Sequence, residues 1–250
     1  MNQIKRLFGW HAVEAAIKHT PQKIVAIWLD AKRRDKRIEK LRLLLNNLQI
    51  DIQSTNRGQL DSLSQRANHQ GVIIDVELPS EQNEEQLKDV VKQSTEILLF
   101  LILDQVQDPH NLGACFRTAD ATGAHGIIIT KDRSASVSPT VYKVASGAVE
   151  TVPLFKVTNL TRTMEWLKKN GIWLMGTDSD AEKTVYECDF TPPVGIVVGA
   201  EGKGLRRLTK EHCDLLIKLP MYGQIESLNL SVATGVVLYE AVRQRSFVKS

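Results

Sequence analysis

Residues 97–130, ILLFLILDQVQDPHNLGACFRTADATGAHGIIIT, contain two almost continuous apolar runs separated by a helical pattern. The runs at 97–104 and 126–130 lack the polar alternation of a strand that faces water on one side. Strands of this kind are buried on both faces, as in a parallel sheet covered by helices. The stretch therefore predicts a β-α-β unit of an α/β protein.

The same pattern continues toward the C-terminus, where three further apolar runs predict three more strands. The runs are 172–178, 194–202 and 215–220. Ligands of parallel sheets bind at the carboxyl ends of the strands, so the loops after the first, fourth and fifth strands are candidate site segments. These loops are DQVQDPHN at 104–111, GAEGKGL at 199–205 and PMYGQIESLNLS at 220–231.

The first third of the chain has a separate α/β pattern. It predicts short helices at 9–18 and 37–49 and strands at 23–30 and 71–78. A polar and acidic stretch follows, PSEQNEEQLKDVVKQSTE, which is typical of a linker that runs into a short helix. We therefore expect three parts, a small domain at 1–78, a linker at 79–95 and a larger domain at 96–250.

Composition is that of an ordinary soluble protein, with 42% hydrophobic and 24% charged residues in 250. The net charge of +3 does not by itself indicate nucleic-acid binding, but residues 1–78 hold 13 basic and 8 acidic residues. Cys115, Cys188 and Cys213 have no metal-ligand or disulfide spacing, so we expect no metal and a reducing compartment. Without an apolar signal segment or membrane span, the sequence predicts a cytoplasmic protein.

Two of the loops contain polar residues that a ligand site could use. VVGAEGKGL at 197–205 fits neither the dinucleotide nor the phosphate-loop glycine spacing, and a surface turn is the alternative to a ligand loop. Its glycines permit close approach of a ligand to the backbone, and Glu201 adds a carboxylate. Ser227 and Asn229 precede an apolar helix, and helix capping accounts for only one of the two.

Three stretches, 108–129, 197–205 and 219–242, resemble in this order the three motifs of the SpoU family of RNA ribose 2'-O-methyltransferases, within the SPOUT superfamily. FGWHAVEAAI at 8–17 and HQGVIIDVE at 69–77 resemble the small RNA-binding domain that precedes the catalytic domain in many members. The resemblance implies a parallel sheet with a deep C-terminal trefoil knot, S-adenosylmethionine as cofactor, and a homodimer. The most similar branch methylates a guanosine ribose in the P loop of 23S rRNA.

Motif positions imply the site residues. Gly199, Leu219 and Leu228 match positions that contact the cofactor, mainly through backbone and apolar atoms. Arg117 matches the catalytic position, although an arginine is nearly always protonated. We therefore expect it to hold an RNA phosphate and stabilise the developing alkoxide, in its own site or the partner's. The alternative is an arginine that packs along its helix and pairs with an acidic neighbour such as Glu201.

Four other residues match functional positions of the motifs, and each has an alternative as turn or cap chemistry. They are Asn111, Glu201, Ser227 and Asn229. Asn111 is expected to fix the loop or contact substrate, and Glu201 to orient Arg117. Glu226 departs from the family pattern, in which a small uncharged residue is usual.

The small domain is expected to supply RNA affinity through a basic cluster that contacts phosphates. The cluster comprises Arg33, Arg34, Lys36 and Arg37. The alternative interpretation is that these four side chains only form the solvent-facing side of a helix. Two other functions stay open at this point, methylation of a tRNA ribose and a non-catalytic RNA-binding protein on the same scaffold.

Overall fold

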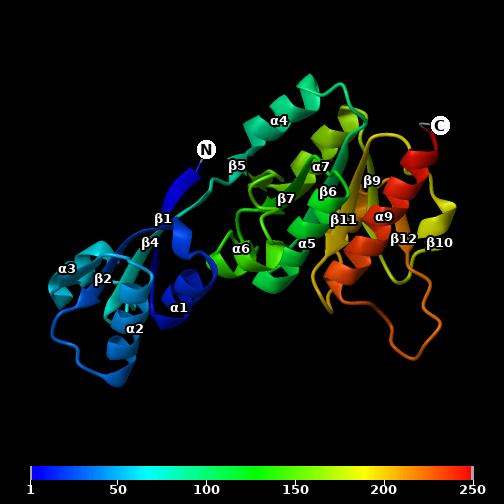
Figure 1. The fold of residues 1–250 in the computed structure, drawn as a ribbon. Helices are drawn as coiled ribbons and strands as arrows, with labels where there is room; N and C mark the ends of the chain where they lie inside the picture. The colour runs from blue at the N-terminus through cyan, green and yellow to red at the C-terminus, as the bar shows by residue number, and fades with distance from the viewer. Residues whose placement is uncertain (1, 249–250) are drawn as a thin grey trace. The chain divides into compact units, whose positions relative to one another are not determined.

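The computed structural model describes residues 2–248, which fall into two compact units. The first contains the chain up to Ser80 together with Val137–Lys143. The second contains Glu81–Ser136 and the chain from Val144 onward. The ribbon in Figure 1 follows the chain through both units.

The first unit is built on a four-stranded mixed sheet in the order β1-β4-β2-β3. Its strands are β1 (Asn2–Phe8), β2 (Ile24–Asp30), β3 (Ile52–Thr55) and β4 (Val72–Pro79). β4 pairs antiparallel with β1 and β2, while β2 pairs parallel with β3. The predicted strands at 23–30 and 71–78 are confirmed, and β1 and β3 are additional.

Three α-helices and a 3-10 turn complete this unit. They are α1 (Trp10–His19), η1 (Pro21–Lys23), α2 (Lys36–Asn47) and α3 (Arg57–Leu63). Asp35 begins α2, because its carboxylate accepts hydrogen bonds from the backbone N–H groups of Arg37 and Ile38. The predicted helices at 9–18 and 37–49 are thus confirmed.

The second unit contains an eight-stranded sheet in which every pair is parallel. The order is β10-β12-β9-β11-β6-β7-β8-β5. In chain order the strands are β5 (Gln82–Asn83), β6 (Leu99–Asp104), β7 (Gly126–Thr130), β8 (Leu154–Val157), β9 (Trp173–Thr177), β10 (Lys183–Thr184), β11 (Val194–Gly199) and β12 (Leu215–Lys218). All five apolar runs are strands, which confirms the α/β class.

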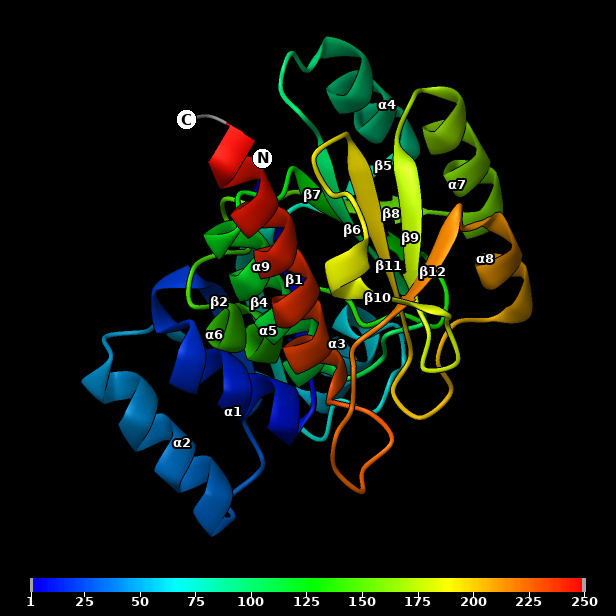
Figure 2. The same ribbon diagram turned by 90° about the vertical axis from the view of Figure 1, so that its right-hand side faces the viewer.

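Helices cover both faces of this sheet, as Figure 2 shows. On one face, α4, α7 and α8 pack over a core that includes Phe100, Met164 and Leu167. On the other, α5 and α9 pack against each other. The helices of this unit are α4 (Glu84–Gln93), α5 (Pro109–Ala121), α7 (Leu160–Lys169), η2 (Val185–Glu187), α8 (Arg207–His212) and α9 (Leu230–Val248). Most of α6 (Pro139–Ala145) belongs to the segment Val137–Lys143 of the first unit.

The stretch predicted to be a linker that runs into a short helix contains that helix, α4, and also the short strand β5. β5 pairs with β8, and α4 buries Leu87 in the core of the second unit. Asn83 and Gln86 form a reciprocal capping box at the start of α4. The polar composition that suggested a linker comes from this cap and from the solvent-facing side of an amphipathic helix.

The last helix is anchored near its end by a charged side chain. The guanidinium of Arg245 donates to the backbone carbonyls of Ile97, Leu98, Phe190 and Pro192 at 2.7 to 3.1 Å. Burial lowers the pKa of Arg245. These bonds fix α9 to the segments that enter β6 and β11.

Candidate functional site

A cavity of about 470 Å³ opens at the carboxyl ends of β9, β11 and β12. Its wall is made by the loops after these strands and by the first turn of α9. The second and third loops predicted from the sequence therefore form one site. The first predicted loop, 104–111, does not line the cavity but supplies a residue to its rim.

The glycine loop at the end of β11 is folded tightly back on itself. A Cβ atom at Gly199 would lie 2.1 Å from the carbonyl carbon of Gly204 and 2.3 Å from the backbone nitrogen of Leu205. Gly204 donates its N–H to Ala200 at 2.8 Å, and its φ of 64° is in the left-handed region. Glycine at 199 is therefore required for this turn.

Asp104, at the end of β6, holds that loop in place. Its carboxylate is fully buried and accepts from the backbone nitrogen of Arg206 at 3.1 Å and from its Nε at 2.8 Å. The hydroxyl of Thr209 donates to the same group at 2.7 Å. A carboxylate buried with this number of donors is well compensated for its lost hydration.

A second acidic residue acts in the same way at the end of β9. Asp178 is buried, lines the cavity and pairs with Lys210 of α8. Asp104 and Asp178 therefore tie the carboxyl ends of β6 and β9 to Thr209 and Lys210 of α8. The sequence reasoning missed these two residues, and the only local signal was an aspartate at the end of each apolar run.

Three residues predicted from the motifs meet at the rim of the cavity. Asn111 donates from Nδ2 to Glu201 at 3.1 Å, and Asn229 donates from Nδ2 to Asn111 at 3.1 Å. Asn229 also lies 3.5 Å from the other carboxylate oxygen of Glu201. The Oδ1 of Asn229 in turn accepts from the backbone nitrogen and hydroxyl of Ser231. Asn229 thus caps α9 and belongs to the site at once.

The remaining cavity residues come mainly from the third loop. Gly199, Leu219 and Leu228, the predicted cofactor positions, all line the cavity. Ser227 and Glu226 also line it, and both are exposed.

Arg117 lies apart from this cluster. It is exposed on α5 and forms no hydrogen bond or ion pair with any other described residue. Six positions separate it from Asn111, which places the two about 120° apart around the helix. The expected Arg117–Glu201 pair is absent from the described chain, because Glu201 faces the two asparagines instead. Arg117 is not among the residues that line the cavity, so its action in its own site or in the partner's stays a prediction.

The basic cluster of the first unit is only partly free. Arg33 and Arg37 lie over the ring of Trp10, with guanidinium carbons 5.2 and 4.7 Å from its centre. Arg33 also pairs with Asp35, and Arg37 pairs with Glu14 at 3.2 Å. Two of the four predicted RNA-binding residues thus have partners within the unit. Arg34 and Lys36 are exposed and form no ion pair with the residues that the structure describes.

The cysteines offer no reactive thiol to the site. Burial raises the pKa of Cys115 to about 12 and that of Cys213 to about 12, and it also raises the pKa of Cys188. Among residues 2–248, no group of three or more His, Cys, Asp or Glu side chains is placed to hold a metal ion. None of the described helices combines the length and apolar character needed to cross a membrane.

Comparison with known families adds to this geometry. Residues 98–239 match the SpoU rRNA Methylase family, and residues 6–82 match the family described as RNA 2'-O ribose methyltransferase substrate binding. A relative from Pseudomonas syringae pv. tomato, the 23S rRNA (guanosine-2'-O-)-methyltransferase RlmB, is 48% identical over 98% of both chains. The RlmB of Escherichia coli K12 is 48% identical over 96% of this chain and 98% of its own.

Solved structures of similar fold include the SpoU methyltransferase AviRb from Streptomyces viridochromogenes in complex with the cofactor AdoMet. It has a TM-score of 0.64 and 27% identity, with 98% of this chain and 91% of that one covered. The TrmH/SpoU tRNA modifying enzyme of A. aeolicus has a TM-score of 0.57 and 33% identity, with 66% of this chain and 85% of that one covered.

Proposed function

The chain belongs to the SpoU rRNA methylase family, and from this membership we propose that it methylates the ribose 2'-hydroxyl of a guanosine in the P loop of 23S rRNA. Family membership and the named relatives make it an S-adenosylmethionine-dependent methyltransferase. The observation that carries the proposal is the cavity in which the second and third motifs meet, with Asn111, Glu201 and Asn229 joined at its rim. We also propose that the protein acts in the cytoplasm, on the ground that its proposed substrate is rRNA.

The cavity fits the cofactor in size and chemistry. Its 470 Å³ is within the range of small-molecule sites. Gly199 keeps the backbone accessible, and Leu219 and Leu228 offer apolar surface to an adenine ring. The carboxylates of Glu201 and Glu226 supply negative charge near a sulfonium cation. When bound, S-adenosylmethionine supplies an electrophilic methyl group.

The rim network would position the ribose for attack. A ribose hydroxyl is a weak nucleophile, so its orientation and the loss of its proton both limit the rate. Asn111 and Asn229 hold Glu201 from two sides and so fix the direction of its carboxylate. Ser227 lines the same cavity, and its exposed hydroxyl can form a hydrogen bond with a sugar. We assign acceptance of the proton that leaves the ribose 2'-hydroxyl to an RNA phosphate or to water.

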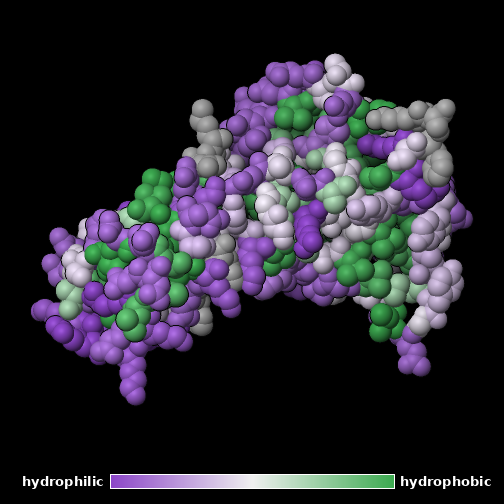
Figure 3. Space-filling view, in the orientation of Figure 1, coloured by the Kyte–Doolittle hydropathy of each residue, from purple (hydrophilic) through white to green (hydrophobic). Residues whose placement is uncertain are grey.

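Arg117 is proposed to act in the cavity of a partner subunit within a homodimer. Its guanidinium would hold an RNA phosphate and stabilise the alkoxide that develops during attack. Two observations support a partner at this face. Arg117 is exposed without a partner among the described residues, and α9 exposes the apolar Val232 at 52%. Apolar side chains gather over the region of α9 in Figure 3.

We also propose that the C-terminal segment is threaded as a deep trefoil knot. β12 lies beyond β9, near one edge of the sheet, whereas α9 returns to pack on α5 and β11. The connection at 219–229 therefore passes close to the loop at 199–205, and both line the same cavity. This arrangement supports a crossing, which is rare among protein folds.

The test is transfer of radiolabelled methyl from S-adenosylmethionine to undermethylated 23S rRNA, with tRNA alongside. Label at a P-loop guanosine ribose is expected with the native chain and at least a hundredfold less with Arg117→Ala. Arg162→Ala, an exposed arginine on α7, is the matched control and should act like the native chain. Label on tRNA alone would refute the substrate, and no label with bound cofactor would favour a non-catalytic RNA-binding protein.

The shared site has its own test. Arg117→Ala and Glu201→Ala chains are each expected to be nearly inactive, but a mixed dimer would contain one cavity with both residues intact. Co-expression of the two chains should therefore restore up to about a quarter to a half of the native rate. No recovery in verified mixed dimers would refute action of Arg117 across the interface.

A further inference from the structure

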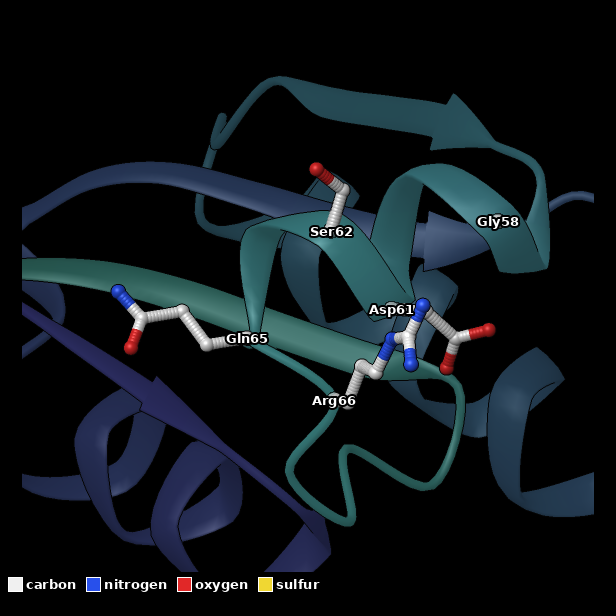
Figure 4. A pocket seen from close by; sticks show the side chains of 5 residues that line it. All are labelled: Gly58, Asp61, Ser62, Gln65 and Arg66. Atoms are coloured by element: carbon white, nitrogen blue, oxygen red, sulfur yellow. The ribbon is translucent and has the colours of Figure 1, made fainter.

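A hollow of about 550 Å³ lies in the first unit, among the loops that follow β2 and α3. We name it the basic pocket and define it by Lys32, Arg57, Asp61, Arg66, His69 and Gly71. A neighbouring hollow shares two of these residues, Asp61 and Arg66, which Figure 4 shows on α3 and just after it. Gln65 points away from both of them.

The floor of the basic pocket is fixed by a buried histidine. His69 is 5% exposed, and its Nδ1 accepts from the backbone nitrogen of Gly71 at 3.0 Å. Its Nε2 must then carry the ring hydrogen, and it donates to Asp61 at 3.0 Å. Arg66 and Gln70 have positive φ values of 64° and 53°. Such backbone persists only where the surrounding contacts determine it, so this loop is held in one shape.

Asp30 and Arg33 also line the pocket, and its charges are unbalanced, because four Lys and Arg side chains face the two carboxylates of Asp30 and Asp61. Lys32, Arg57 and Arg66 form no side-chain hydrogen bond or ion pair with any residue that the structure describes. The carboxylate of Asp61 is engaged by His69, as described above. This differs from Arg33, whose guanidinium is already bonded to Asp35 and to the carbonyl of Gln70.

We propose that the basic pocket binds the phosphodiester backbone of the substrate RNA, at nucleotides other than the one that is methylated. Three unpaired cations around one hollow suit a polyanion, no Phe, Tyr or Trp lines the pocket, and the one aromatic ring there, His69, is buried. The pocket thus supplies affinity and register without reading bases. The inference rests on the proposed function. It moves the main RNA contact from the predicted cluster at 33–37 to a pocket formed by Lys32 and by residues of α3 and the loop that follows it.

The test compares RNA binding by two triple variants. One replaces Lys32, Arg57 and Arg66 by alanine, and the matched control replaces Lys18, Lys40 and Arg42, which are on α1 and α2 outside the pocket. Fluorescence anisotropy with a labelled 23S rRNA fragment gives Kd over a series of salt concentrations.

We expect the pocket variant to raise Kd at least tenfold. The slope of log K against log salt should fall by about 2, because each lost contact with single-stranded RNA removes about 0.7. The control should stay within about twofold of the native chain. Equal losses in both variants, or none in the pocket variant, would overturn the proposal.

Further measurements separate this inference from folding and from the proposed function. Lys32→Glu with Arg57→Glu leaves the strained Arg66 in place, and circular dichroism melting shows whether each variant is folded. A pocket variant should keep native affinity for S-adenosylmethionine and native kcat at saturating RNA, with KM raised. If the native chain binds RNA through the pocket but transfers no methyl group, the proposed methyltransferase function is refuted and the proposal that the pocket binds RNA is retained.

Discussion

Replacement of Gly199 by alanine tests whether the cofactor cavity depends on one close backbone approach. The added Cβ would lie 2.1 and 2.3 Å from the carbonyl carbon and oxygen of Gly204. Ordinary van der Waals contact begins at 3.4 Å, so the opposing backbone must retreat by more than about 1 Å. No flexible side chain is available to absorb this shift.

The size of the effect follows from which atoms must move. Overpacking of this kind costs about 1–3 kcal/mol of folding free energy. The retreat also breaks the 2.8 Å hydrogen bond between Gly204 and Ala200, which shapes the wall of the cavity. Since 1.4 kcal/mol corresponds to a factor of ten, we expect S-adenosylmethionine to bind at least about tenfold more weakly.

Isothermal titration calorimetry measures the affinity, and urea denaturation measures the free energy of unfolding. Gly223→Ala is the matched control, because a Cβ at Gly223 meets no atom within 4 Å and its φ is not in the left-handed region. The control should bind like the native chain. A Gly199→Ala variant with native affinity and native stability would refute the argument from close approach.

Three other predictions concern single contacts. Asp104→Ala should lower the free energy of unfolding by about 2–3 kcal/mol in urea denaturation, because it leaves a bound arginine and threonine without their acceptor; a loss below about 0.5 kcal/mol would contradict this. Alanine at Asn111 and at Glu201 should give non-additive losses in kcat/KM, with a coupling of about 1 kcal/mol, since the two side chains share one network. Fully additive losses would show that they act separately. The hydrogen bond from Arg243 lowers the pKa of Glu240 below its usual 4.5, so its contribution to stability is present above that pH and is lost as the pH falls through the folded value. Unfolding followed from pH 6 to pH 3 should therefore depend less on pH for Glu240→Gln, and identical profiles would exclude this pair as the cause.

The parallel sheet could be predicted because burial on both faces leaves a direct mark on sequence. Strands such as 99–104 are apolar at every position except the last, and helices between them repeat with a different period. β1 escaped prediction because its run, NQIKRLF, alternates weakly and several of its side chains are exposed. Its place in the sheet comes from pairing with β4, a contact about 70 residues away in the chain.

The candidate site was predictable only where a motif marks it. Asn111, Glu201 and Asn229 were found by their motif positions, and the structure brings them together. The clamp from Asp104 to Arg206 joins residues 102 positions apart, so no local pattern reveals it. The partners of the basic run at 32–37 could not be predicted for a related reason, since nothing near it in sequence indicates that Trp10 lies beneath two of its arginines.

The anchoring of α9 has a consequence for folding during synthesis on the ribosome. The first turn of this helix closes the cavity, and Arg245, near its other end, fixes it to segments made much earlier. A chain still emerging from the ribosome therefore has every strand of its sheet but no finished site. The cavity can close only after α9 has been made, so a chain that stops before this helix would lack the wall that Leu230 and Ala233 supply.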